Sequence, residues 1–171
     1  FMTGRYAVNT GLPFAMFPGS VAGLPDDMAT MPQLLRQAGY SAHMVGKWHL
    51  GFESWDFTPI GRGFDSFFGY LGGGEDYLTH MSGGYVDLTS NRQPVLDATG
   101  KYSTELFANK SIDVIRLHLA AATSRPLFLY LAMQAIHSPL QAPADGTAPP
   151  RPRWPERGAP LPGCPAEGGL F

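Results

Sequence analysis

Cysteine is almost absent from this chain of 171 residues, which has a single one, Cys164. One cysteine supports no internal disulfide and says little about the redox compartment. Charged residues are also few, at 15% of the chain, and the 12 basic and 14 acidic ones nearly balance to a net charge of −2. The basic residues are scattered, so the sequence predicts no broad attraction to nucleic acid or to an anionic membrane surface.

Long apolar runs are missing as well. The longest candidate, 126–135, has the length of a core strand and falls short of the roughly 18–20 apolar residues that a membrane-spanning helix needs. No signal peptide is visible. The hydrophobic share of 44% is nevertheless sufficient for a packed core. We therefore expect a domain with a real core and no membrane span.

The order of the expected elements predicts an α/β domain. A helix begins after a capping threonine near residue 30 and ends at a glycine near residue 39, and a short strand covers 40–45. A longer amphipathic helix covers 103–119. The continuous apolar run 127–133 is typical of a strand buried on both faces of a parallel sheet. Between these elements, 51–100 is expected to form long ordered loops with short strands or turns.

Three side chains that could take part in a reaction follow the two expected strands. Lys47 and His49 come directly after the first strand, and His137 follows the second. If the backbone stays extended past Gly46, Lys47 and His49 project to the same side. A fixed cation and a group that exchanges protons near neutral pH suit an anionic, oxygen-rich substrate group. Ligands bind beyond the carboxyl ends of parallel strands, which is where all three residues lie.

Plainer interpretations stay open for these residues. Lys47 and His49 could be a solvated pair in a loop, and His137 could be a structural histidine at a strand end. For His43, which lies inside the first strand, and for His80 we expect structural roles.

Other polar residues in the middle of the chain carry weaker signals. Asp76 and Tyr77 could shape a substrate pocket or form a capped turn with a packed tyrosine. Arg62 and Asp65 are expected to form a local charge pair. The glycines 72–74 indicate a flexible turn, because no lysine and serine or threonine follow them as in a phosphate-binding loop.

Several segments of the chain, taken in order, resemble the sulfatase family and most closely its arylsulfatase B-like members. The resemblance covers nearly everything from Thr3 to Pro143, and its order makes it specific. The segments that carry it are Thr3-Gly4-Arg5-Tyr6, Leu34-Leu35-Arg36-Gln37-Ala38-Gly39-Tyr40, His43-Met44-Val45-Gly46-Lys47-Trp48-His49-Leu50-Gly51, Arg62-Gly63-Phe64-Asp65, Glu75-Asp76-Tyr77, Pro126-Leu127-Phe128-Leu129-Tyr130-Leu131-Ala132 and His137-Ser138-Pro139-Leu140.

The resemblance implies an alkaline-phosphatase-like α/β fold and hydrolysis of sulfate esters by a formylglycine nucleophile, with Ca²⁺ as cofactor. By resemblance, Lys47 contacts the sulfate and the nucleophile oxygen, and His49 supports the formylglycine hydrate. His137 lies at the sulfate and the leaving-group oxygen. The implied partner is a sulfated small molecule or a sulfated glycan, in a secreted, lysosomal or periplasmic location.

The departures from the family pattern define what this chain is expected to lack. The family's Cys-x-Pro-x-Arg motif, which yields formylglycine, does not occur here, and Cys164 lies in an unrelated context. The family's metal ligands are expected outside this chain too. We interpret 1–143 as a central slice of a sulfatase catalytic domain that is inactive alone. The Pro/Gly-rich tail 144–171 is expected to be disordered, either as a genuine tail or as a gene-model artefact.

Two alternatives remain beside an arylsulfatase-like enzyme. The chain could be a non-catalytic sulfatase remnant, or it could belong to a phosphodiesterase or phosphonate hydrolase of the same superfamily.

Overall fold

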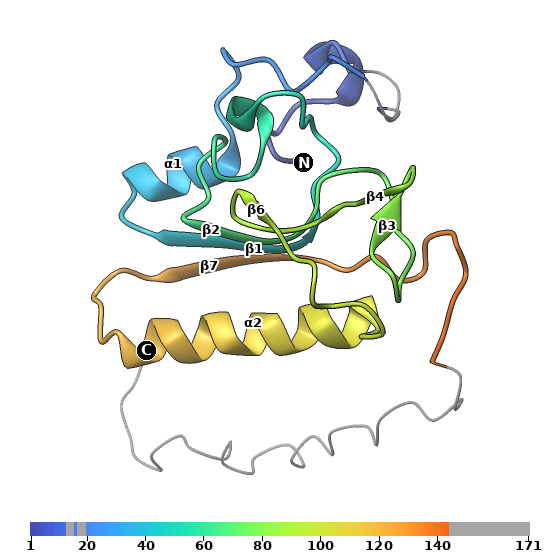
Figure 1. The fold of residues 1–171 in the computed structure, drawn as a ribbon. Helices are drawn as coiled ribbons and strands as arrows, with labels where there is room; N and C mark the ends of the chain where they lie inside the picture. Colours follow the sequence, from blue (N-terminus) through green and yellow to red (C-terminus); the bar gives the residue numbers. More distant parts are fainter. Residues whose placement is uncertain (13–15, 17–19, 144–171) are drawn as a thin grey trace.

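A five-stranded sheet with one helix on each face forms the centre of the molecule (Figure 1). The computed structural model describes residues 1–12, 16 and 20–143. The expectation for the tail 144–171, including Cys164, therefore lies outside the described residues. No helix in the part of the chain that the structure describes is long and apolar enough to cross a bilayer.

The long strands of the sheet are parallel and its short strands are antiparallel. The strand order is β6-β5-β2-β1-β7, with β1 paired in parallel to both β2 and β7. The bounds are Ser41–Lys47 for β1, Ser66–Tyr70 for β2, Leu88–Ser90 for β5, Gln93–Pro94 for β6 and Leu127–Ala132 for β7. A separate hairpin is made by β3 (Met81–Ser82) and β4 (Tyr85–Val86). The loops predicted over 51–100 thus carry short strands, as expected.

The first helix, α1 (Met31–Gln37), confirms the prediction of a threonine cap. Gln33 and Thr30 form a capping box, in which the Thr30 backbone N–H donates to Gln33 Oε1 at 2.8 Å. Such reciprocal bonds satisfy N–H groups that have no partner within the helix. The second helix, α2 (Ser103–Ala120), agrees with the predicted range to one residue.

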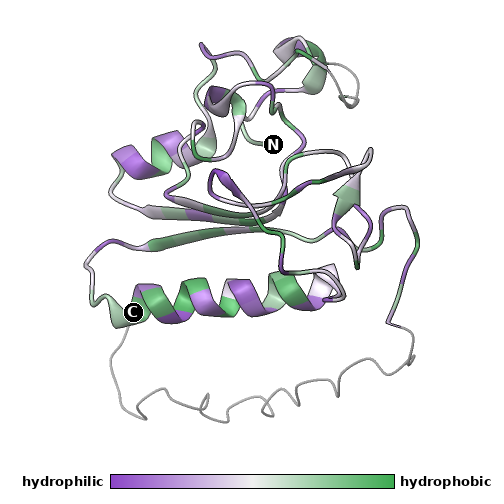
Figure 2. Cartoon of the chain, viewed as in Figure 1, coloured by the Kyte–Doolittle hydropathy of each residue, from purple (hydrophilic) through white to green (hydrophobic). Residues whose placement is uncertain are grey.

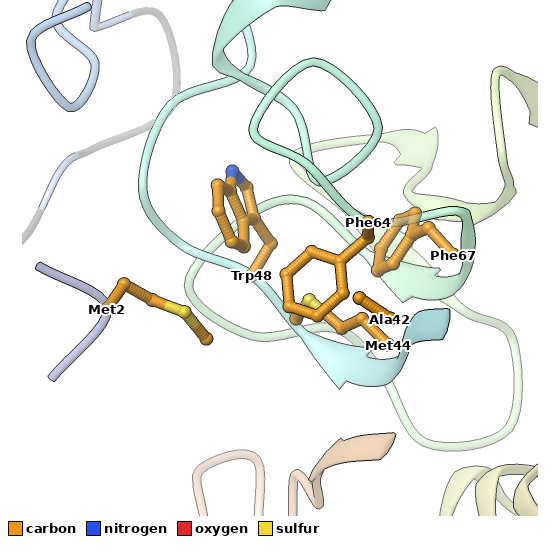
Figure 3. Packing of buried hydrophobic residues seen from close by; sticks show 6 residues of the cluster. All are labelled: Met2, Ala42, Met44, Trp48, Phe64 and Phe67. Atoms are coloured by element: carbon orange, nitrogen blue, oxygen red, sulfur yellow. The ribbon is translucent and has the colours of Figure 1, made fainter. Parts of the chain in front are cut away.

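Alternation along β1 divides the core between the two faces of the sheet. On the face of the sheet where α1 lies, Ala42 and Met44 pack with Trp48 and Phe64, and Figure 3 shows this packing. Val45 points to the opposite face, where Phe107 of α2 is fully buried. Hydrophobic and hydrophilic residues alternate along α2 (Figure 2), so one side of this helix can pack on the sheet.

Strand β7 corrects one expectation. The apolar run was expected to be buried on both faces, but none of its residues is buried and Leu131 is 40% exposed. The physical reason is position, because β7 is the outermost strand of the described sheet and pairs only with β1 there. A continuous apolar run shows that a strand can be buried on both faces, but it does not show whether other elements cover those faces.

Candidate active site

The carboxyl edge of the parallel strands holds the three residues that the sequence singled out. Lys47 is the last residue of β1, His49 follows two residues later, and His137 lies five residues beyond the end of β7. Because β1 and β7 run in the same direction, their ends lie at the same edge of the sheet (Figure 1).

The backbone at the end of β1 does not continue in the extended form on which the sequence argument depended. Gly46 has φ +104° and His49 has φ +56°, both in the left-handed region. Gly46 takes this conformation where β1 and β7 approach closely, since a Cβ atom there would lie 2.0 Å from the Ala132 carbonyl oxygen. Lys47 and His49 therefore come together through a turn and not through strand alternation.

A turn of three glycines, 72–74, is the meeting point of the site. The Lys47 ammonium group donates to the Gly73 carbonyl oxygen. A Cβ atom on Gly73 would lie 2.9 Å from Cε1 of His49, and one on Gly74 would lie 3.2 Å from Nδ1 of His137. The two imidazole rings thus lie against successive residues of one turn, and Lys47 is bound to the same turn.

The hydrogen bonds of the two imidazoles define which ring nitrogen is available. Nε2 of His49 lies 2.8 Å from the Met16 carbonyl oxygen, and Nδ1 of His137 lies 2.8 Å from the Ser138 carbonyl oxygen. A carbonyl oxygen only accepts, so each of these nitrogens carries the proton and donates it. The other nitrogen of each ring, Nδ1 of His49 and Nε2 of His137, is then the one that can exchange a proton with a substrate.

Partial burial gives this edge its electrostatic character. Burial lowers the pKa of the Lys47 ammonium group. Asp87 lies on the far side of the turn, where its carboxylate accepts from the backbone N–H of Leu71 at 3.0 Å and of Gly72 at 2.9 Å. Burial raises the pKa of Asp87, and these two N–H groups and the nearby His49 act in the opposite direction. Asp87 therefore fixes the turn and places a carboxylate near His49.

The segment around His137 is held by the loop that follows the glycine turn. The hydroxyl of Tyr77 donates to the His137 carbonyl oxygen at 3.0 Å, and the ring of Tyr77 stacks on Tyr102 at 5.3 Å. The amide of Gln134 donates to the Glu75 carbonyl oxygen. His137 as a whole is exposed, so its backbone is anchored while the residue stays accessible to a substrate.

Asp76 forms the capped turn that was one of its two predicted interpretations. Its Oδ1 atom accepts from the backbone N–H of Thr79 at 2.7 Å and of Leu78 at 3.0 Å, and its Oδ2 atom accepts from Gln141 at 2.6 Å. The bonds from Thr79 and Gln141 lower the pKa of Asp76 to about 2. Because both of its carboxylate oxygens accept these hydrogen bonds, we assign Asp76 a role in stabilising the loop and none in proton transfer.

His80 has a structural role, as predicted, inside a buried polar cluster. Its Nδ1 atom lies 3.1 Å from Oε1 of Glu75, and its Nε2 atom donates to the Ala98 carbonyl oxygen at 3.1 Å. The Ser103 hydroxyl donates to the same Glu75 oxygen at 3.0 Å. Burial lowers the pKa of His80, but the hydrogen bond and charge of Glu75 outweigh it and the net pKa is raised. The cluster resembles a catalytic triad only in composition, because the serine and the carboxylate meet the same ring nitrogen and all three residues are buried.

His43 bonds within the sheet, and the expected pair of Arg62 and Asp65 does not form. Nδ1 of His43 lies 2.7 Å from the Ser66 hydroxyl within the sheet, which agrees with the structural role that was expected. The pair of Arg62 and Asp65 is wrong, because Arg62 is buried and bonds to Asp26 at 3.2 Å, while Asp65 pairs with arginines elsewhere in the chain. Closeness in sequence was a poor guide, since the intervening turn sends the two side chains to different partners.

The contribution of the glycine turn and of Asp87 was not anticipated. Three consecutive glycines indicate flexibility, but here Gly73 and Gly74 lack side chains because two imidazoles occupy the space. The available signal was the requirement for small residues where groups approach closely. Nothing in the local sequence of Asp87 announced its bonds to the turn, which lies 15 residues earlier.

The described residues offer no set of metal ligands. Among residues 1–12, 16 and 20–143, no group of three or more histidine, cysteine, aspartate or glutamate side chains could hold a metal ion. The Ca²⁺ that the resemblance implies does not fit the residues present, and we derive no step through it.

The chemistry available at this edge is the binding of an anionic group with proton transfer beside it. One ammonium group lies within reach of the turn that both imidazoles contact. Such preorganised donors stabilise charge that develops on oxygen atoms during a reaction. Imidazole side chains within reach of a substrate can act as general acids and bases.

Comparisons with known proteins point to one family. A family model described as Sulfatase matches residues 1–152. Arylsulfatase J of Mus musculus is 46% identical over 151 residues, which cover 84% of this chain and 25% of that protein. N-acetylgalactosamine-6-sulfatase of Canis lupus familiaris is 33% identical over 156 residues, which cover 83% of this chain and 28% of that protein. The chain thus spans about a quarter of the length of these curated relatives.

The solved structure of Ps i-CgsB in complex with k-i-k-neocarrahexaose is also similar to this chain. It has a TM-score of 0.74 at 30% sequence identity, and the match covers 84% of this chain and 35% of that one. The likeness confirms the expected fold class.

Proposed function

We propose, from the premise that this chain belongs to the sulfatase family, that it is the segment of an arylsulfatase-like sulfuric ester hydrolase that holds the sulfate and moves protons. One observation carries the proposal. Lys47, His49 and His137, from two different strand ends, all contact the turn at Gly73 and Gly74. An ammonium group and two imidazoles at one turn can supply the charge stabilisation and the proton transfer that sulfate ester cleavage requires.

Each of the three residues has a distinct proposed role. Lys47 donates hydrogen bonds to the sulfuryl oxygens, on which negative charge develops. His137, in its doubly protonated imidazolium form, gives the Nε2 proton to the oxygen of the departing alcohol and becomes the neutral imidazole, since an alcohol leaves more easily than an alkoxide. His49, through Nδ1, takes a proton from the nucleophile side.

The nucleophile of the proposed reaction, a formylglycine hydrate, would come from sequence outside these 171 residues. When present it would supply the hydroxyl nucleophile for the reaction at sulfur, beside Lys47 and His49. The proposal also includes a sulfated small molecule or sulfated glycan as substrate and a secreted, lysosomal or periplasmic location. These points rest on the family and on the glycan complex of the neighbouring structure.

The proposal is tested with the natural protein that contains this chain and with 4-nitrophenyl sulfate as substrate. Lys47→Ala, His49→Ala and His137→Ala are each expected to lower kcat/KM by about 10²–10⁴-fold, the range for loss of a group that transfers protons or stabilises charge. Lys101→Ala and His118→Ala are the matched controls and should keep wild-type activity, because neither side chain contacts the glycine turn in the structure.

The alternatives give different results in the same assay. A natural protein that cleaves no sulfate ester would indicate the non-catalytic remnant. A protein that cleaves bis(4-nitrophenyl) phosphate far faster than the sulfate would indicate the phosphodiesterase alternative. Either outcome would overturn the proposal.

A further inference from the structure

A cavity opens beside the glycine turn, at Gly72 and Gly73, and Lys47 bonds to the second of these residues. Its volume is about 290 Å³. The residues that line it are Met16, Phe52, Gly72, Gly73, Ser82, Gly83, Tyr85, Val86 and Asp87. Small-molecule sites range from about 300 to 1,000 Å³, so this cavity is just below the smallest of them and suits a single ring.

Two residues of the cavity wall accept hydrogen bonds from the proposed catalytic groups. Gly73 accepts the hydrogen bond of Lys47, and the carbonyl oxygen of Met16 accepts the hydrogen bond of His49. The opposite wall is the β3–β4 hairpin, which lies beyond the carboxyl ends of β1 and β2 (Figure 1). A sulfate held by Lys47 would therefore place the rest of its ester next to this cavity.

The chemistry of the lining favours a ring that carries no charge. Tyr85, which is 80% exposed, and Phe52 offer aromatic faces on which a ring can stack. No lysine, arginine or histidine is among the described residues that line the cavity, and Asp87 is the acidic group among them. An anionic substituent that reaches Asp87 would be repelled by its carboxylate, and no cationic side chain among the described lining residues offsets this repulsion.

We propose that this cavity receives the ring that carries the sulfate and selects an uncharged ring over one with a carboxylate. The inference rests on the proposed function and adds to it the class of alcohol that the site accepts. Asp87 has two functions in this account, since it fixes the glycine turn and repels an anionic substituent. Discrimination between the two classes of ring comes from repulsion as well as from stacking.

The test compares two aryl sulfates that differ by one charge, 4-carbamoylphenyl sulfate and 4-carboxyphenyl sulfate. The natural protein is expected to hydrolyse the amide with a kcat/KM at least about tenfold higher, as a partly buried like-charge contact predicts. Ser82→Lys places a cation at the cavity wall and should reduce this preference by about fivefold or more. Gln37→Lys adds the same charge on exposed α1 and should leave the preference unchanged.

The outcomes separate this inference from the proposed function. Equal kcat/KM for the two esters in the natural protein, or equal effects of Ser82→Lys and Gln37→Lys, would overturn the inference and leave the sulfatase proposal intact. Hydrolysis of neither ester would overturn the proposed function itself, and the inference with it.

Discussion

Replacing Gly73 by alanine should displace the His49 imidazole while leaving the fold almost intact. The new methyl carbon would lie 2.9 Å from Cε1 and 3.0 Å from Nε2 of His49. Ordinary contacts between such atoms are about 3.5–4.0 Å, so the ring must move by roughly 0.5–1 Å. Gly73 has no left-handed φ, and the backbone therefore accepts alanine without strain.

The size of the effect follows from this displacement. A catalytic group misplaced by about 1 Å can cost about 10²-fold in rate, which corresponds to about 2.7 kcal/mol. Loss of the bond from His49 to the Met16 carbonyl oxygen would cost about 1 kcal/mol of folding free energy. We therefore expect kcat/KM to fall about a hundredfold and stability to fall by about 1 kcal/mol.

The assay is hydrolysis of 4-nitrophenyl sulfate by the natural protein, with unfolding in urea measured in parallel. Gly100→Ala is a control of similar cost to stability, because Gly100 has φ +87° and open space around it. It should keep wild-type activity. In a His49→Ala background, Gly73→Ala should have no further effect on kcat/KM. Wild-type activity of the single variant, or additive losses in the double variant, would refute the reasoning.

Two further predictions concern stability. Gly46→Ala should lower the free energy of unfolding in urea by about 3 kcal/mol or more, because its methyl group would lie 2.0 Å from the Ala132 carbonyl oxygen. Gly39→Ala, which has open space around it, should lower it by about 1 kcal/mol. Equal losses would contradict the close approach of β1 and β7. Asp76 has its pKa lowered to about 2, so its contribution is present above its ordinary value of 3.8 and is lost as pH falls toward 2. With allowance for solvent screening, the Asp76→Asn variant should lose about 1 kcal/mol less stability than the wild type between pH 4 and pH 2, and parallel pH profiles would refute this.

The helices and the central strand could be predicted from the sequence because local signals determine them. The cap at Thr30 fixes the start of α1, and apolar spacing defines α2. The order of elements also placed Lys47, His49 and His137 at strand ends, since the carboxyl ends of parallel strands share an edge.

The rest of the site depends on contacts that are distant in sequence. The bond from Lys47 to Gly73 spans 26 residues, and the partners of Arg62 lie more than 30 residues away. The left-handed backbone at Gly46 also could not be predicted from the neighbouring residues, because it depends on the close approach of β7. The apolar pattern of β7 likewise could not tell an edge strand from a buried one.

Peptide mapping of the natural protein by mass spectrometry tests the proposal that these residues serve a formylglycine-dependent sulfatase. We expect a peptide with a Cys-x-Pro-x-Arg motif, joined upstream of Phe1, in which the cysteine is converted to formylglycine. A natural N-terminus at Phe1 or Met2, with no such peptide, would overturn the proposal, because Lys47, His49 and His137 would then have no nucleophile.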